Sequence, residues 1–61
     1  MTLRELVQSM YADEKLLIRD GGNLTEINVE DLVNDREDLH EKVVVLITWS
    51  QLFNAILIEV E

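Results

Sequence analysis

Apolar residues near the start of the chain recur at the spacing of one helix face. A T-x-x-E capping box, formed by Thr2 and Glu5, precedes them and satisfies backbone N–H groups at a helix N-terminus. The pattern ends at Asp13, so the helix is short and has to be held by packing. We predict an N-terminal amphipathic helix that buries its apolar face on the rest of the domain. The residues of that face are Leu3, Leu6, Val7, Met10 and Tyr11.

The next segment has the pattern of a β-hairpin. Residues 15–19 (KLLIR) and 24–29 (LTEINV) are rich in strand-forming residues, and polar and apolar positions alternate in the second of them. Between them, Gly21 and Gly22 are flanked by Asp and Asn, which suits a tight turn with positive φ. A glycine pair also cradles phosphate when a helix N-terminus and a Lys follow it, but neither follows here. We therefore predict a hairpin turn.

The longest apolar run, residues 43–60, contains the only Trp and the only Phe of the chain. Its content of Val, Ile and Thr favours strands over a helix. We predict one strand over residues 43–50 and another over 55–61, joined by a connection over 51–54. The run approaches the length of a membrane-spanning helix, but polar residues lie at its centre and no Lys or Arg follows it. We therefore expect no membrane span.

The first strand of this run is apolar on both faces, which is typical of a central strand or of a strand covered on both sides. Since only one helix is expected, the monomer covers one face of the sheet, and we predict that a homodimer covers the other. The candidate interface residues are Val44, Leu46, Trp49, Leu52, Phe53 and Leu57. The alternative is that Trp49 and Phe53 complete the core of the monomer.

The segment over residues 30–42 is the hardest to assign. Leu32, Val33 and Leu39 provide a small apolar face, and Asn34 is a good N-cap for a turn of helix. A long connection of this kind is where functional residues collect. Its acidic residues form a candidate contact surface: Glu30, Asp31, Asp35, Glu37, Asp38 and Glu41.

Length and composition limit the fold to one small domain over residues 1–61. A chain of 61 residues buries a small core and gains from a partner subunit. There is no Cys, which excludes disulfides and thiol chemistry, and the N-terminus lacks the apolar core of a signal peptide. We predict a cytoplasmic α+β domain in which an N-terminal helix packs on an antiparallel sheet of about four strands, arranged as two hairpins.

Candidate chemistry is sparse, and we expect neither an enzyme nor a bound cofactor. His40 is the only His, and Glu37 precedes it by three positions. Glu-x-x-His ligates metals when further ligands are present, so a minimal metal-dependent enzyme is the contrasting hypothesis, and a solvated loop His is the simpler one. Neither Ser9 nor Ser50 lies in a nucleophile pattern such as G-x-S-x-G.

The charge balance argues against direct binding of nucleic acid. The formal net charge is −8, and the five basic residues are scattered along the chain. Phosphate contacts provide most of the affinity in such complexes, so this surface repels a duplex. An acidic protein can instead occupy the basic groove of a nucleic-acid-binding protein, in an interaction that weakens with salt. The alternative is that the acidic residues only keep the protein soluble.

The order of these features resembles small uncharacterised proteins of Gram-positive bacteria and their phages. The likeness rests on the TLREL helix, the KLLIRDGGNLTEINV hairpin, the acidic connection and the VVVLITW…AILIEV hairpin. It implies a cytoplasmic accessory protein and transfers no site residues. Our leading hypothesis is a non-enzymatic interaction module that acts as a homodimer. The alternative is an acidic nucleic-acid mimic that binds a basic host protein.

Overall fold

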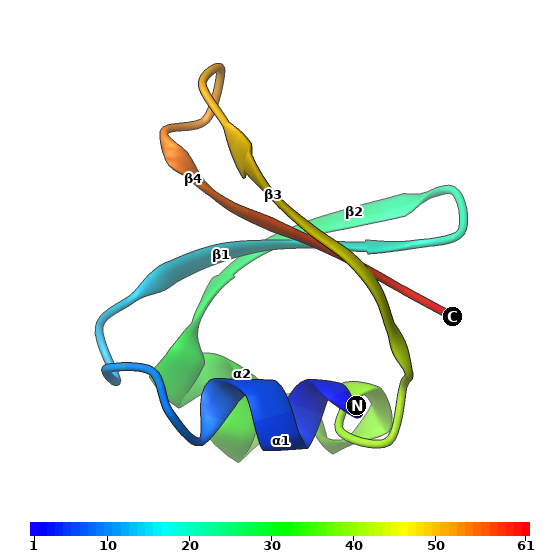
Figure 1. The fold of residues 1–61 in the computed structure, drawn as a ribbon. Helices are drawn as coiled ribbons and strands as arrows, with labels where there is room; N and C mark the ends of the chain where they lie inside the picture. Colours follow the sequence, from blue (N-terminus) through cyan, green and yellow to red (C-terminus); the bar gives the residue numbers. More distant parts are fainter.

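The four strands form one mixed sheet in the order β2-β1-β4-β3 (Figure 1). The computed structural model describes residues 1–61. Strands β1 (Lys15–Asp20) and β2 (Asn23–Asn28) form one antiparallel hairpin, and β3 (Val44–Ser50) and β4 (Ala55–Val60) form the other. The prediction of four strands in two hairpins is confirmed.

The prediction that the sheet is wholly antiparallel is wrong, because β1 and β4 pair in parallel at its centre. Both strands carry unbroken apolar runs, LLI in β1 and AILI in β4. Strands of this composition are buried on both faces, as in parallel sheets. These two strands lie side by side at the centre of the sheet, and each has its hairpin partner on its outer side.

All the helical segments lie on one face of the sheet (Figure 1). The N-terminal helix α1 spans Leu3–Val7, and both halves of the predicted capping box are formed. The Glu5 backbone N–H donates to the Thr2 hydroxyl, and the Thr2 N–H donates to the Glu5 carboxylate at 2.8 Å. The helix is shorter than its apolar pattern. Met10 still packs on the core, whereas Tyr11 is exposed, so its assignment to the buried face is wrong.

A second helix, α2, spans Val29–Asp35 and was not predicted. Its N-cap is Asn28, whose side chain accepts a hydrogen bond from the Asp31 N–H at 2.8 Å. Asn34, the expected N-cap, lies in the last turn of α2 instead. Val29 is therefore the first residue of a helix and not the end of a strand. A one-turn 3-10 helix, η1 (Glu37–Leu39), follows and adds a buried Leu39.

The core lies between the helical layer and the sheet. The segment over residues 30–42, expected as a connection, supplies Leu32 and Leu39 to the core because α2 and η1 turn these side chains inward, and Val29 at the start of α2 adds a third. Val44 and Ile56 pack against its margin. The core residues are Leu3, Val7, Leu16, Ile18, Val29, Leu32, Leu39, Ile58 and Val60.

Each hairpin turn contains one residue in the left-handed region. Gly21 has φ +62° in the two-residue turn between β1 and β2, where a positive φ at the first position is typical of a type II′ turn. Asn54 has φ +53° at the end of the turn between β3 and β4. Asn tolerates this region better than most residues do.

No helix of the protein has the length and apolar character to cross a membrane.

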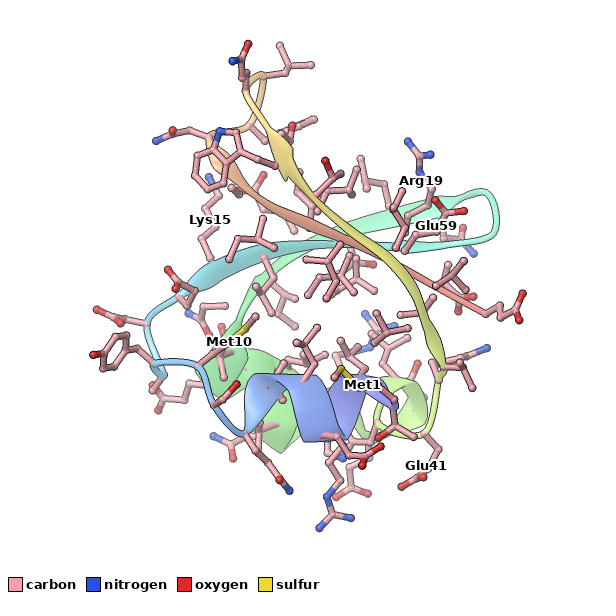
Figure 2. All side chains as sticks on the ribbon, viewed as in Figure 1. Met1, Met10, Lys15, Arg19, Glu41 and Glu59 are labelled. Atoms are coloured by element: carbon pink, nitrogen blue, oxygen red, sulfur yellow. The ribbon has the colours of Figure 1, made fainter.

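Charged side chains lie over β1 on the face of the sheet away from the helices (Figure 2). Leu17 points to this face, yet it is only 1% exposed. Lys15 and Glu26 form an ion pair of 3.0 Å beside it. In Figure 2 Lys15, Arg19 and Glu59 all lie on this side, away from the helical layer. The aliphatic stems of such side chains shield apolar surface while their charged ends stay in water.

Candidate interaction surface

β3 is an edge strand, so the expectation of a central strand is wrong. It pairs with β4 on one side, and no strand of the chain pairs with its other side. The turn between β3 and β4 lies at the far end of the molecule from α1 and α2 (Figure 1). The helical layer therefore does not reach the second half of β3.

A β-bulge at Val45 sets which side chains of β3 face the core. Val44 is opposite Val60, and Leu46 is opposite Glu59, so the register shifts by one residue between them. Neighbouring residues of a strand point to opposite faces. Simple alternation had placed Val44 and Leu46 on one face, and the bulge places them on opposite faces. Val44 packs against the core, whereas Leu46 is on the face away from the helices.

Large apolar side chains are exposed along β3 and the turn that follows it. Among the six candidate interface residues, Leu46 is 49% exposed, Trp49 55% and Leu52 87%, and Phe53 is also exposed. Neither Trp49 nor Phe53 belongs to the core. Val44 and Leu57 are only half-buried and lie closer to the sheet centre. Sequence reasoning missed Val45 and Ile47, which are exposed because β3 is at the edge.

The outer edge of β3 is closed at its start and open thereafter. The Val44 N–H donates to the Met1 carbonyl at 2.8 Å, and Thr2 bridges Val43 in antiparallel fashion. Beyond the bulge, residues Leu46–Ser50 have β4 as their only strand neighbour. Alternate residues of this stretch direct their N–H and C=O groups away from β4. An open strand edge of this kind is a template for a further strand.

The same segment is free of charge. No Asp, Glu, Lys or Arg lies between Lys42 and Glu59, in a chain of which 30% is charged. Exposed edge strands in most proteins carry a charged residue, often Lys, that blocks pairing. The only such device near β3 is the bulge at Val45. The surface formed by Val45, Leu46, Ile47, Trp49, Leu52 and Phe53 is hereafter called the β3 surface.

The acidic residues predicted as a contact surface lie on α2, on η1 and just after η1. All six side chains are exposed. Arg36 is the only cation among them, and it forms a bidentate pair with Asp38 at 3.0 and 3.1 Å. The hydrogen bonds from Arg36 lower the pKa of Asp38, and the same pair raises the pKa of Arg36. This pairing leaves the other five carboxylates without an ion-pair partner.

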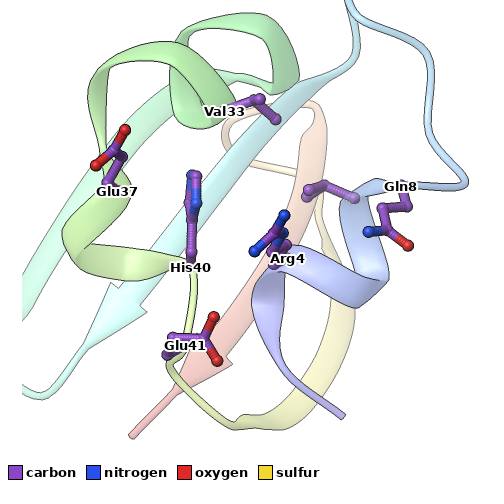
Figure 3. A pocket seen from close by; sticks show the side chains of 7 residues that line it. Arg4, Gln8, Val33, Glu37, His40 and Glu41 are labelled. Carbon is purple, nitrogen blue, oxygen red and sulfur yellow. The ribbon is translucent and has the colours of Figure 1, made fainter.

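A shallow groove of about 590 Å³ separates α1 from α2 and η1 (Figure 3). Arg4 of α1 lies opposite His40, and Glu37 and Glu41 line the rim. His40 is half-buried, and its Nε2 is 3.1 Å from the Leu32 carbonyl oxygen. The expectation of a solvated loop His is therefore wrong: the ring ties the end of η1 to α2.

Glu37 and His40, the pair singled out for metal chemistry, both line this groove. No three His, Asp or Glu side chains lie close enough together to hold a metal ion. Glu5, on the same helix as Arg4, is engaged in the capping box. The hydrogen bond from the Thr2 backbone N–H, and next that from its hydroxyl, lowers the pKa of Glu5. Of the polar side chains that line the groove, His40 alone forms a hydrogen bond within the protein.

Comparison of the chain with protein-family models, with curated proteins and with solved structures finds no match.

Proposed function

We propose that the protein is a non-enzymatic interaction module that acts as a homodimer through the β3 surface. The observation that carries this proposal is the coincidence of three properties on one segment. Leu46–Ser50 has an open edge, exposed apolar side chains on both faces and no charge. Most edge strands lack at least one of these properties, because together they favour association.

The exposure of the β3 surface supports a specific contact. Its six side chains are 38 to 87% exposed, and large apolar side chains gathered at the surface in this way mark an interaction site. Tyr11 and Val33 are exposed singly elsewhere, as is normal for a protein surface. Charge favours a second copy at this place. Each copy carries −8, and two copies meet with least repulsion where neither has a charged residue.

Sedimentation equilibrium over a wide concentration range tests the homodimer. We expect a mass that rises from 7.1 kDa to twice that value. Added salt should leave the dimer intact or strengthen it, because salt screens the repulsion between the two acidic chains. A mass of 7.1 kDa throughout, at concentrations up to the millimolar range, would contradict the proposal.

A matched pair of charge variants locates the contact. Leu46 and Leu24 are both 49% exposed, and they lie on opposite edges of the same sheet face. Leu46→Lys should weaken dimerisation by about tenfold or more, since a Lys on an edge strand opposes pairing. Leu24→Lys adds the same charge to β2 and should leave dimerisation unchanged. Equal effects of the two variants would place the contact elsewhere.

A second function, binding of a basic protein surface as a nucleic-acid mimic, is supported by the exposure of all six acidic residues between Glu30 and Glu41. These residues lie on the helical side, away from the β3 surface, so the two functions are compatible. Two substitutions there (Glu30→Gln, Asp35→Asn) are compared with two at the end of β4 (Glu59→Gln, Glu61→Gln). The first set should elute from a polylysine resin at lower salt than the second. Equal elution would mean that only net charge matters.

A further inference from the structure

We infer that the two copies pair edge to edge, with the β3 strands antiparallel about a two-fold axis that passes through Thr48. This inference rests on the proposed homodimer and specifies its geometry. It makes each copy complete the open sheet edge of the other. The partner of β3 is then the β3 strand of the second copy.

The length of the open edge selects the register. When a strand pairs with itself in antiparallel fashion about Thr48, Leu46 is opposite the partner's Ser50. This register uses all of Leu46–Ser50 in both copies and nothing outside it. A register centred nearer the chain start includes the bulge and the edge that Met1 closes. A register centred further on extends into the turn, which begins at Gln51.

The side chains in this register are mutually suited. Ile47 is opposite the partner's Trp49, and the two-fold axis repeats this pair. Thr48 is opposite the partner's Thr48. Pairs of an aromatic with a β-branched residue, and pairs of Thr with Thr, are among the cross-strand pairs that stabilise antiparallel sheets. The sequence Ile47-Thr48-Trp49 is thus self-complementary about its central residue, as an isologous interface requires.

The pairing also arranges the charges favourably. Opposite residues of paired strands share a face, so the helical layers of both copies lie on one side of a continuous sheet. Its strand order is β2-β1-β4-β3 followed by the same four strands in reverse. The uncharged segment lies at the axis, and β2 of each copy lies at the far edges. The acidic segments around α2 are therefore kept apart.

Cysteine variants test the register, because the chain has no native Cys and each variant carries a single thiol. In Thr48→Cys the two thiols are on directly opposite residues, whose Cα atoms are about 4.5 to 5.5 Å apart. This spacing fits a disulfide. Ser50→Cys is the matched control, a small polar residue on the same face of β3. Its two copies are offset by four positions, which is about 13 Å along the strand.

Under mild oxidation, Thr48→Cys should give roughly tenfold more covalent dimer than Ser50→Cys, since only the first satisfies disulfide geometry. Sedimentation of the reduced variants is measured in parallel. A reduced dimer in which Thr48→Cys does not cross-link preferentially would overturn the edge pairing and leave the homodimer standing. A monomeric unsubstituted protein would overturn both.

Discussion

The two hairpins of the sheet have the same antiparallel construction but differ in how far their apolar side chains are buried. In β1–β2, Leu16 and Ile18 are buried in the core, and Leu17, on the other face, is buried beside the ion pair of Lys15 and Glu26. In β3–β4 the inner strand is buried, whereas the outer strand exposes apolar side chains on both faces. The chain thus has charged residues that can screen a sheet face, and it places none of them on β3. This contrast is the basis for the proposal that the β3 surface is a contact surface.

The largest effect is expected from truncating one leucine in each region. Leu16→Ala removes a fully buried side chain and should lower the free energy of unfolding by about 2 to 5 kcal/mol. Leu46→Ala removes a half-exposed one and should cost less than about 1 kcal/mol in the monomer, since surface substitutions have small effects. Urea unfolding at low protein concentration measures both. Similar losses would mean that β3 is packed as tightly as the core.

The two turns provide the next comparison. Gly21 has a positive φ and no atom within 4 Å of where a Cβ would stand, so Gly21→Ala tests backbone strain alone. It should lower stability by about 1 to 2 kcal/mol, the cost of a left-handed conformation for a residue with a side chain. Asn54→Gly, at the equivalent φ in the other turn, should change stability by only a few tenths of a kcal/mol. Thermal unfolding of both variants gives the comparison.

The helix cap that supports the well-packed region should contribute about 1 kcal/mol. Asn28→Ala removes the acceptor for the Asp31 N–H and should destabilise the protein by about that amount. Asn34→Ala is the control, because Asn34 is exposed near the end of α2 and forms no side-chain hydrogen bond. Ala has the higher helix propensity, so this variant should be neutral or slightly more stable. A larger loss at Asn34 would contradict the assignment of the cap.

The smallest effect concerns acid stability. The pKa of Asp38 is lowered in the folded protein, so its carboxylate stabilises the fold above its ordinary pKa of about 3.9. This contribution is lost as the pH falls through the lowered value. Asp38→Asn should therefore reduce stability slightly at neutral pH and flatten its decline in acid. Asp13→Asn, at a residue without an ion pair, should leave the shape of that curve unchanged.

The local elements could be predicted from the sequence because their signals are local. The capping box, the Asp-Gly-Gly-Asn turn and the strand composition each act within a few residues. The second helix was missed because Val29 continues the alternation of β2, and this alternation obscured the Asn28 cap. Asn28, with Glu30 and Asp31 in the turn that follows it, is by itself a signal for the start of a helix.

The arrangement of the sheet could not be predicted in the same way. The position of β3 at the edge and the parallel pairing of β1 with β4 depend on where a long connection returns, which no short motif specifies. The bulge at Val45 places Val44 on the face opposite to Leu46, because one extra residue shifts the alternation of side chains along the strand. The acidic residues were expected on a loop, and they lie mostly on helical turns.

The parallel pairing at the centre of the sheet has a consequence for folding kinetics. It joins Leu16 to Ile56, forty positions away, whereas each hairpin joins near neighbours. Hairpins form in about 1 to 10 μs, but contacts between distant residues require a large loop to close first. Docking of the two hairpins should therefore limit the folding rate. Until they dock, the uncharged run of β3 and β4 is exposed to other chains. Aggregation of newly synthesised chains is therefore most favoured in that interval.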